Sequence, residues 1–545
     1  MRKTLVLGID SGCWDYIEPL LTAGEMPNVA RLIERGGRGV LESTMPPITP
    51  VAFASFLTGV NPGKHGVFDW SVRMGEGQRV QPASFLSFRA PPFWRHLNAA
   101  GVRVGLFNVP MTYPPTPLEG FIVPGVGAPP AARDLTYPPE VLDRLDRRWG
   151  GTYTIGVPRK LLRSQGLEAY VAAWERHEAM QTEAALELME AYEVDLLAFN
   201  YASPDRINHF SPSMEHIARI LRHVDRQIGR FIDRYPEANF ILMSDHGSRR
   251  IQRAFLLGKW LAQHGYAAYG EKSLDITGRE VNGVLHRYLE ARGWKGTPER
   301  LLRYLVRWPI RLLPPPLRRA FWRRLHRSAP EIFAYRFEDR LDWSRTRVFA
   351  TSNSGPLFIN TNGHRLSPEG YEQLREAVIR DLLAVRDRAT GEPVFHHVYR
   401  REELYHGAAL SLAPDLIADH YRSACDLIVD NDLKTFCFVD RLNRFGDHIR
   451  EGILVFGGPD FAAGVDGMAS ASILDLPATL LHLYGVPVPQ EWDGRVLSEL
   501  LAPPVRERPV ARAEGELSGL SETEGGYTAE DEAQVMDHLR DLGYL

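Results

Sequence analysis

Apolar runs of strand length alternate along most of the 545-residue chain with segments whose apolar residues recur at helical spacing. The apolar runs span residues 4–10, 103–110, 194–202, 239–247 and 452–461. Helices are predicted over 26–36 and over 214–235, where the apolar side chains fall on one stripe. Strands that are apolar throughout and are separated by helices favour an α/β fold, with a mostly parallel central sheet and helices on both faces.

The chain is too long for one ordinary core, so we expect a large domain with smaller additions. We predict the main α/β domain over 1–260, an Arg-rich helical insertion over 261–345, a small mixed α/β or cap subdomain over 346–440, a return to the main domain over 441–504, and a polar linker with a short C-terminal helix over 505–545. Strands near 347–360 and a helix over 368–387 are expected in the subdomain. Thr528 is the expected cap of the last helix, and Gly543 is expected to follow its last turn.

Composition limits the classes of partner and compartment. With 24% charged residues and a net charge of −4, the chain offers no global reason to bind nucleic acid. Its three cysteines form no CxxC pair, which favours a reducing compartment. The N-terminal apolar run stops at Asp10 without a cleavage site, and no run is long enough to span a bilayer. We therefore expect a cytoplasmic protein.

Residues 300–327 form an unusual segment with nine arginines and no acidic residue. One interpretation is a helical pair, broken at Pro314–Pro316, whose Arg stems cover the rim of the main domain. The other is a basic amphipathic surface that makes peripheral contact with an anionic membrane or favours acidic substrates. The sequence leaves both open.

Carboxylates and imidazoles gather in four short stretches, each predicted at a strand exit. The stretches are "GIDSG" with Asp10, "SPDRINH" with Asp205 and His209, "SDHG" with Asp245 and His246, and "GDHIREG" with His448. Ligands of parallel sheets bind beyond the carboxyl ends of the strands. Three carboxylates and three imidazoles are suitable ligands for two divalent ions such as zinc or manganese. Each stretch alone is weak evidence, so the prediction of a metal site depends on the occurrence of all four together.

A Thr-Pro pair begins the apolar segment "TPVAFASFLTG". Thr49 is a suitable N-cap and Pro50 suits the first helical position, so the pair could serve only to start a helix. A helix N-terminus also attracts phosphate, and a hydroxyl there beside a divalent ion would be an activated nucleophile. Both interpretations predict a helix that begins at this pair.

Taken together, these motifs resemble the alkaline phosphatase superfamily, and most closely its type I phosphodiesterase/nucleotide pyrophosphatase branch with the related predicted phosphohydrolases and phosphomutases. The resemblance rests on the strand-end Asp10, on Thr49 leading into "FLTGVNPGKHG", on "PDRINH" and "SDHG", and on a late His before "GILVFGGPDF". Residues 473–497 also resemble the closing helix and Asp-Gly-Arg turn of that family.

The resemblance implies a metal-dependent phosphoester hydrolase with Thr49 as the catalytic nucleophile and a phosphothreonine intermediate. It implies two divalent metal ions, zinc or else manganese or iron. One would be held by Asp205, His209 and His448, and the other by Asp10, Asp245 and His246. His448 is preferred to His406 and His420 because it directly precedes the "GILVFGGPDF" strand. A small-molecule or lipid-type phosphoester is the expected substrate. A phosphomutase and a non-catalytic phosphoester-binding protein remain alternatives.

The sequence departs from that branch shortly after its His-Gly pair. The branch has an asparagine there that helps to hold a phosphoryl oxygen, whereas this chain has Phe68, Asp69 and Trp70. Backbone N–H groups at the start of the Thr49 helix, or the side chain of Lys64, could supply the missing donor. Lys64 is therefore a candidate substrate-binding residue.

Overall fold

The computed structural model describes residues 2–73, 80–129, 132–269, 341–361, 364, 366–429, 437–439 and 444–514, together with 531, 532, 534–536 and 539 near the C-terminus. The Arg-rich segment 300–327, Thr528 and Gly543 lie outside these residues, so the predictions that concern them remain predictions. Among the described residues, none of the helices combines the length and apolar character that a membrane span needs.

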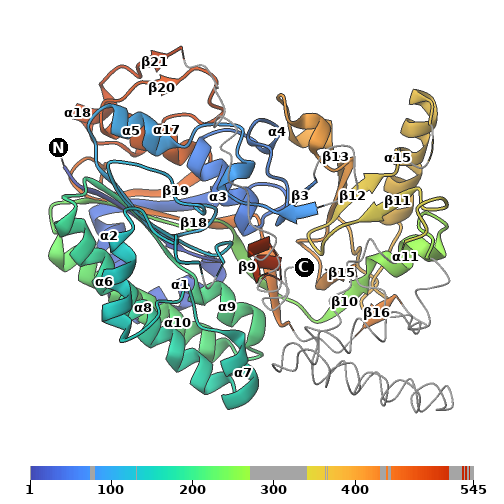
Figure 1. Cartoon of the computed structure of the whole chain (residues 1–545), viewed down its shortest axis with the longest axis horizontal. Coiled ribbons are helices and arrows are strands. Elements are labelled where there is room, and N and C mark those ends of the chain that lie inside the picture. Colours follow the sequence, from blue (N-terminus) through green and yellow to red (C-terminus); the bar gives the residue numbers. More distant parts are fainter. Residues whose placement is uncertain are drawn as a thin grey trace, which may run out of the picture.

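An eight-stranded sheet forms the centre of the larger part of the molecule (Figure 1). Its strands, in spatial order, are β19 (Val465–Ser472), β2 (Gly36–Glu42), β18 (Glu451–Gly457), β8 (Asn239–Met243), β1 (Thr4–Ile9), β7 (Leu196–Tyr201), β5 (Val104–Val109) and β6 (Gly120–Pro124). Strand β1 pairs in parallel with both β7 and β8, and β5 pairs in parallel with β6 and β7. The predicted α/β class with a mostly parallel sheet is confirmed.

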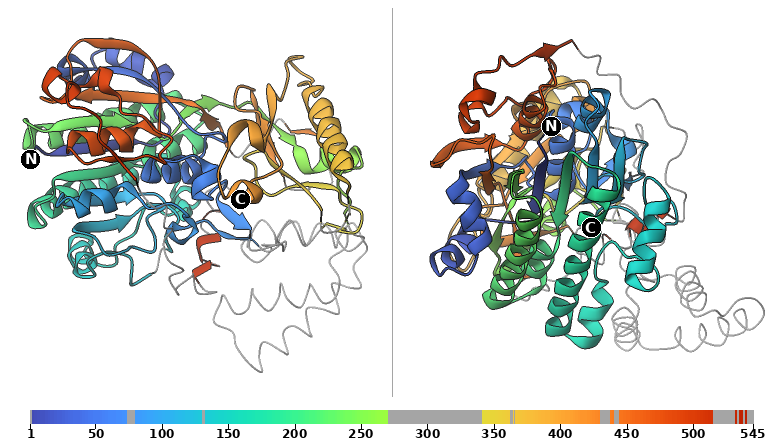
Figure 2. Two further views of the ribbon diagram at one scale, coloured as in Figure 1. Left: turned by 90° about the horizontal axis from the view of Figure 1, so that it is seen from above. Right: turned by 90° about the vertical axis from the view of Figure 1, so that its left-hand side faces the viewer.

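Both faces of this sheet are covered by helices, as Figures 1 and 2 show. Within β1, Leu5, Leu7 and Ile9 face one core and Val6 faces the other, because successive side chains of a strand alternate. The first core is covered by α1 (Trp14–Thr22), α2 (Pro27–Arg35), α6 (Glu140–Trp149), α8 (Leu167–Ala191) and α10 (Met214–Arg234). The second is covered by α3 (Thr49–Thr58), α5 (Phe93–Ala99) and α17 (Asp475–Leu483).

One strand of the sheet runs against the others. β18 pairs antiparallel with both β2 and β8, whereas β19 pairs in parallel with β2. β2 was not predicted, because Gly36 and Gly37, with which it begins, were interpreted as the end of the preceding helix. Its glycines are required by close approach: a Cβ on Gly36 would lie 2.1 Å from the carbonyl oxygen of Phe456, and one on Gly37 would lie 2.0 Å from that of Val465.

A second unit with its own hydrophobic core lies beyond the carboxyl ends of the parallel strands rather than on one face of the main sheet (Figures 1 and 2). Its four-stranded antiparallel sheet contains β11 (Val348–Ala350), β12 (Pro356–Ile359), β14 (Leu416–Asp419) and β13 (His397–Arg400). A three-stranded sheet contains β15 (Cys425–Ile428), β10 (Arg253–Leu256) and β16 (Phe438–Val439). Helices α11 (Leu257–Gln263) and α15 (Pro368–Leu383) complete the unit. Strands β11 and β12 lie where strands were predicted, near 347–360, and α15 occupies most of the helix predicted over 368–387.

Shorter elements connect these layers. They include α4 (Pro62–His65), β3 (Ser71–Arg73), β4 (Val80–Pro82), α7 (Arg159–Gln165), α9 (Ser203–Phe210), β9 (Gly247–Arg250), α16 (Arg401–Leu404), β17 (Gly446–Ile449), β20 (Val488–Pro489), α18 (Pro503–Arg506) and β21 (Arg512–Ala513). Near the C-terminus, Val535 and Leu539 are buried against Ile48 and Val51, which lie at the start of α3.

Candidate active site

Three neighbouring parallel strands deliver acidic residues to one edge of the main sheet. Asp10 directly follows β1, and Asp245 lies two residues beyond β8. β7 leads into α9, which carries Asp205 in its first turn and His209 four residues later. Because the carboxyl ends of parallel strands lie together, these side chains meet in space. In the sequence they are far apart, with Asp10 and Asp245 separated by 235 positions.

Helix α3 brings Thr49 to the same place. All ten of its residues are buried, and the helix ends at Gly59, whose left-handed backbone has φ 69°. The predicted role of Thr49 as the N-cap is wrong: Ile48 occupies the cap position, and Thr49 is the first helical residue. Its hydroxyl is therefore not needed for capping, and Thr49 Oγ1 lies 3.3 Å from His246 Nε2.

Asp10, Asp245 and His246 form one group of metal-ligand type. One ligand atom from each lies within 4.8 Å of the others. His246 Nε2 lies 3.2 Å from Asp245 Oδ2 and 4.0 Å from Asp10 Oδ1. This is the second predicted set of three, and Thr49 lies beside it.

Asp205, His209 and His448 form the neighbouring group. Asp205 Oδ1 lies 3.0 Å from His209 Nε2 and 3.3 Å from His448 Nε2, and the two imidazole nitrogens are 3.2 Å apart. His246 also lies close enough to Asp205 and His448 to replace His209 in a set of three. The rings of His246 and His448 are stacked, with 3.8 Å between their centroids, so the two groups adjoin.

The sequence predicted that His448 lies at the exit of a strand, and this prediction is wrong. It lies within β17, opposite Ser248 of the antiparallel strand β9. The chain continues beyond Asp245 and His246 into β9, so a new strand pair forms past the edge of the main sheet. β17 precedes β18 directly, and this pairing holds the His448 ring beside His246.

Burial and mutual repulsion raise the pKa of Asp10 and of Asp245, whereas the neighbouring His209 and His448 hold the pKa of Asp205 well below its usual value. Burial raises the pKa of Asp10 well above its usual value, and Asp245 and Asp205 raise it further. Burial, followed by the charge of Asp205, raises the pKa of Asp245 to about 7. Burial lowers the pKa of His448 to about 3, with His246 acting in the same direction. Several buried acids are thus held close together at a place where a positive charge would relieve their repulsion.

The donor atoms fit divalent ions. Asp10 Oδ1, Asp245 Oδ2 and His448 Nδ1 are buried and accept or donate no hydrogen bond. Buried polar atoms are normally paired, so these atoms indicate that a ligand completes the site. Carboxylate oxygens and imidazole nitrogens in such a mixture suit zinc, manganese or iron.

Two site residues were missed by the sequence reasoning. Ser11 Oγ donates to Asp205 Oδ1 at 2.8 Å and lies 3.3 Å from His246 Nδ1, and the Ser11 N–H donates to Asp245 Oδ1 at 3.3 Å. Its φ of 64°, in the left-handed region, makes these contacts possible. Asn200 Nδ2 donates to Asp10 Oδ2 at 3.1 Å. A polar residue next to Asp10, and an Asn inside an apolar strand, were the signals available.

Other residues position the side chains of these two groups from outside. His209 Nδ1 lies 2.8 Å from the carbonyl oxygen of Gly446, which fixes the ring and directs Nε2 into the site. Glu178 of α8 accepts hydrogen bonds from the backbone N–H and the hydroxyl of Ser203, the first residue of α9. Through this contact, α8 positions the helix that carries Asp205 and His209.

Lys64 is engaged in other contacts. Its ammonium donates to Asp493 Oδ1 and to the carbonyl oxygen of Glu491, both at 2.6 Å. His406, considered as an alternative to His448, also lies near Asp493, with His406 Nε2 3.0 Å from Asp493 Oδ1. Within the described parts of the chain, Lys64 makes no hydrogen bond or ion pair with Thr49.

His420, the other alternative, belongs to a third cluster with Asp426 and Asp447. Arg249 Nη2 lies 2.7 Å from Asp447 Oδ2, and Arg444 Nη1 lies 3.8 Å from Asp426 Oδ2. Two guanidinium groups therefore already balance the two carboxylates. This cluster is an ion-pair network between the main domain and the second unit.

Comparisons with solved structures and with a family model show what this chain is similar to. The chain resembles the structure of human ectonucleotide pyrophosphatase/phosphodiesterase 5, with 14% identity, a TM-score of 0.49, and coverage of 92% of this chain and 100% of that one. The murine protein of the same name gives 12% identity, a TM-score of 0.47 and the same coverage. No sequence match is found among curated proteins. The sequence model of the type I phosphodiesterase/nucleotide pyrophosphatase family matches residues 4–436. The chain therefore belongs to the type I phosphodiesterase/nucleotide pyrophosphatase family and is a phosphoric ester hydrolase.

Proposed function

We propose that this protein hydrolyses small phosphodiesters through a phosphothreonine intermediate on Thr49, at a site for two divalent metal ions. The observation that carries the proposal is the position of Thr49 Oγ1, 3.3 Å from His246 Nε2 at the start of a buried helix. A hydroxyl with no capping role, next to a group of metal-ligand type, is the arrangement expected of an activated nucleophile.

The two groups of side chains divide the metal-binding role. Asp10, Asp245 and His246 would hold the ion nearer to Thr49, and Asp205, His209 and His448 would hold the other. Zinc is the first expectation for this ligand set, with manganese or iron as alternatives. Divalent ions bound there would supply Lewis-acid stabilisation of the Thr49 alkoxide and of the leaving oxygen.

The chain itself contributes the nucleophile and its alignment. Thr49 Oγ1 forms a bond to phosphorus, the bond from phosphorus to the leaving oxygen breaks, and that oxygen keeps the electron pair. The Thr49 hydroxyl proton is lost to solvent. In the second step, a water oxygen bonds to phosphorus, Thr49 Oγ1 leaves, and Thr49 regains a proton. The positive end of the α3 dipole favours the anionic phosphoryl group in both steps.

Replacement of Thr49 by alanine tests the proposal directly. We expect Thr49→Ala to lower kcat on bis(p-nitrophenyl) phosphate by at least about 1000-fold, since the covalent step is lost. Metal content, measured by inductively coupled plasma mass spectrometry, should stay unchanged and will identify the metal. Thr49→Ser should retain measurable turnover.

Thr58 offers a matched control on the same helix. It is also buried, but its hydroxyl donates to the carbonyl oxygen of Ala54 at the other end of α3. Thr58→Ala should therefore keep near-normal turnover. Near-normal hydrolysis by Thr49→Ala would refute the nucleophile assignment. An isomerised phosphomonoester as the product, in place of a hydrolysed one, would indicate a mutase.

A further inference from the structure

Tyr405 of the second unit reaches the segment that leads into α3. It lies between β13 and β14, and its side chain is only 4% exposed. Its hydroxyl donates to the main-chain carbonyl oxygen of Met45 at 2.5 Å. Met45 belongs to the connection between β2 and α3 and lies four residues before Thr49. A side chain of the second unit therefore holds the backbone that leads to the proposed nucleophile.

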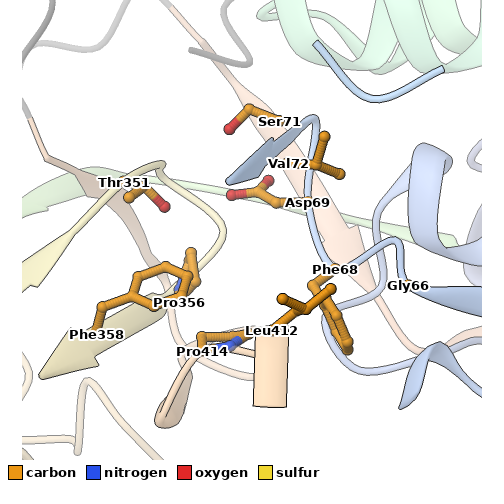
Figure 3. A pocket seen from close by; sticks show the side chains of 10 residues that line it. All are labelled: Gly66, Phe68, Asp69, Ser71, Val72, Thr351, Pro356, Phe358, Leu412 and Pro414. Carbon is orange, nitrogen blue, oxygen red and sulfur yellow. The ribbon is translucent and has the colours of Figure 1, made fainter. Parts of the chain in front are cut away.

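Apolar side chains from both parts of the molecule surround this hydrogen bond. Met45 and Phe68 of the main domain form one buried cluster with Tyr405, and the rings of Phe68 and Tyr405 have 5.3 Å between their centroids. Leu412 of the second unit packs against the same cluster, and Figure 3 shows Phe68 and Leu412 beside one small cavity at this junction. Water does not replace a donor in such surroundings, so loss of the Tyr405 hydroxyl leaves the Met45 carbonyl without its partner.

The chain just after Tyr405 also contacts α4, the helix that follows α3. The Ala409 N–H donates to the carbonyl oxygen of Gly63 at 2.8 Å. A Cβ on Gly63 would lie 2.4 Å from the carbonyl oxygen of His406, so the two backbones touch. The segment 405–409 thus contacts the chain both before and after α3.

The two ends of α3 differ in how they are anchored. At the far end, the N–H groups of Asp493 and Gly494 donate to the carbonyl oxygen of Gly59 at 3.1 and 3.3 Å, and these residues belong to the main domain. At the near end, the bond from Tyr405 is the one hydrogen bond that joins residues 44–48 to a distant part of the chain, among the residues that the structure describes. The start of α3 therefore depends on the second unit more than its end does.

We propose that Tyr405 is a positioning residue for Thr49, an inference that rests on the proposed function. Its hydroxyl fixes the Met45 carbonyl and so aligns the first turn of α3 with the metal-ligand groups. Thr49 Oγ1 lies 3.3 Å from His246 Nε2, and a shift of the helix start moves this hydroxyl out of line for attack on phosphorus. A misplacement of about 1 Å can cost about 100-fold in rate. The second unit thus acts on the chemistry through Thr49.

Tyr405→Phe tests the inference because it removes only the hydroxyl. We expect kcat on bis(p-nitrophenyl) phosphate to fall roughly 10- to 100-fold while KM stays within about threefold, since alignment is lost and substrate binding is not. Metal content per protein molecule should equal that of the wild type. An equal metal content excludes a loss of folded sites as the cause of the lower kcat.

Tyr421→Phe is the matched control. Tyr421 belongs to the same buried cluster and is 2% exposed, but its hydroxyl donates to the carbonyl oxygen of Ser354 at 2.8 Å, within the second unit. Each variant loses one buried hydrogen bond to a main-chain carbonyl, so the two urea midpoints should fall alike. Only Tyr405→Phe should lower kcat. Equal losses of kcat in both variants would show a general structural effect and overturn the inference.

Two further measurements follow the helix start itself. Hydrogen exchange in a peptide covering 45–52 should accelerate in Tyr405→Phe and not in Tyr421→Phe. Tyr405→Phe combined with Thr49→Ala should hydrolyse the ester at the rate of Thr49→Ala alone, because a residue that acts through Thr49 has no hydroxyl left to position. A further loss of rate in the double variant, or unchanged exchange in Tyr405→Phe, would contradict the inference.

The outcomes separate this inference from the proposed function. If Thr49→Ala keeps near-normal turnover, the proposed function fails and this inference fails with it. If Thr49→Ala is inactive while Tyr405→Phe has the kcat of the wild type, the proposed function stands and only the positioning role of Tyr405 is overturned.

Discussion

Glu178 of α8 accepts two hydrogen bonds from Ser203, one from the backbone N–H at 2.8 Å and one from the hydroxyl at 2.6 Å. Both residues are fully buried. Ser203 begins α9, which carries Asp205 in its first turn and His209 four residues later. The orientation of one candidate metal group therefore depends on an acid that is not itself a ligand.

Glu178 should make stability depend on pH. Burial raises its pKa from 4.5 to about 7. Between these values the unfolded chain releases a proton that the folded chain retains, so rising pH favours unfolding, and the effect is complete above pH 7. The loss amounts to roughly 3 kcal/mol. Glu178→Gln removes this titration, so its unfolding free energy relative to wild type should rise by that amount between pH 4.5 and 8.

Urea unfolding of both proteins at a series of pH values, with metal concentration held constant, measures this difference. Tyr201 neighbours Glu178, and its own ionisation lies above the range used. A constant difference between Glu178→Gln and wild type across the series would contradict the raised pKa of Glu178.

Ser11 should tune the metal site without being a predicted ligand. Its hydroxyl donates to Asp205 Oδ1 and lies 3.3 Å from His246 Nδ1, so it connects the two candidate groups. We expect Ser11→Ala to weaken metal affinity roughly 10- to 100-fold, as the loss of an orienting hydrogen bond does elsewhere. Competition with a fluorescent chelator measures the affinity. Ser213, whose hydroxyl caps α10 by accepting the N–H of Glu215, offers Ser213→Ala as the control.

Removal of divalent ions should both inactivate and destabilise the protein. Asp10, Asp245 and Asp205 repel one another in a buried site, and a bound ion offsets that repulsion. Treatment with a chelator should lower Tm, and excess zinc or manganese should restore Tm and activity in a concentration-dependent way. An active, equally stable protein that contains no metal by mass spectrometry would contradict the two-metal proposal.

The sequence predicted much of this site because parallel strands make it simple to infer. Asp10 and Asp245 follow apolar strands that lie side by side, so their convergence required only the fold class. His448 was harder, because its position depends on the pairing of β17 with β9, a contact between distant segments that leaves no local signal. Ser11 was missed because its contacts depend on a left-handed backbone with φ 64°, and the neighbouring residues do not predict that conformation.

The same limit applies to the fold. β2 begins with two glycines that resemble a helix end, and only the close approach of β18 and β19 explains them as strand residues. Thr49 was assigned to the cap because Thr-Pro usually starts helices that way, whereas the hydroxyl faces His246 instead. The strands predicted over 4–10, 103–110, 194–202 and 239–247, where the local pattern is apolar throughout, are present as β1, β5, β7 and β8.

The close approach at Gly36 predicts a sharp stability effect. A Cβ there would lie 2.1 Å from the carbonyl oxygen of Phe456, so the backbones of β2 and β18 must separate. We expect Gly36→Ala to cost at least about 2 kcal/mol of unfolding free energy. Gly151 has no atom near its Cβ position, so Gly151→Ala should change stability by less than about 1 kcal/mol. Urea unfolding compares them, and equal effects would contradict the steric argument.

The C-terminal residues should be held to the start of α3 by a small apolar contact. Val535 and Leu539 are each 1% exposed and pack with Ile48, Val51 and Trp70. Leu539→Ala removes apolar area from this contact and should weaken it by up to about 3 kcal/mol, the range of buried Leu-to-Ala changes at sites that can relax. Because the contact joins the C-terminal residues to the start of α3, the loss should appear as local opening rather than global unfolding.

Hydrogen exchange should therefore accelerate in a peptide covering 45–58, while the urea midpoint of the main domain stays within error. Val510, which is exposed, provides Val510→Ala as the control with unchanged exchange. Unchanged exchange over 45–58 in Leu539→Ala would show that the C-terminal residues do not protect the helix that begins at Thr49.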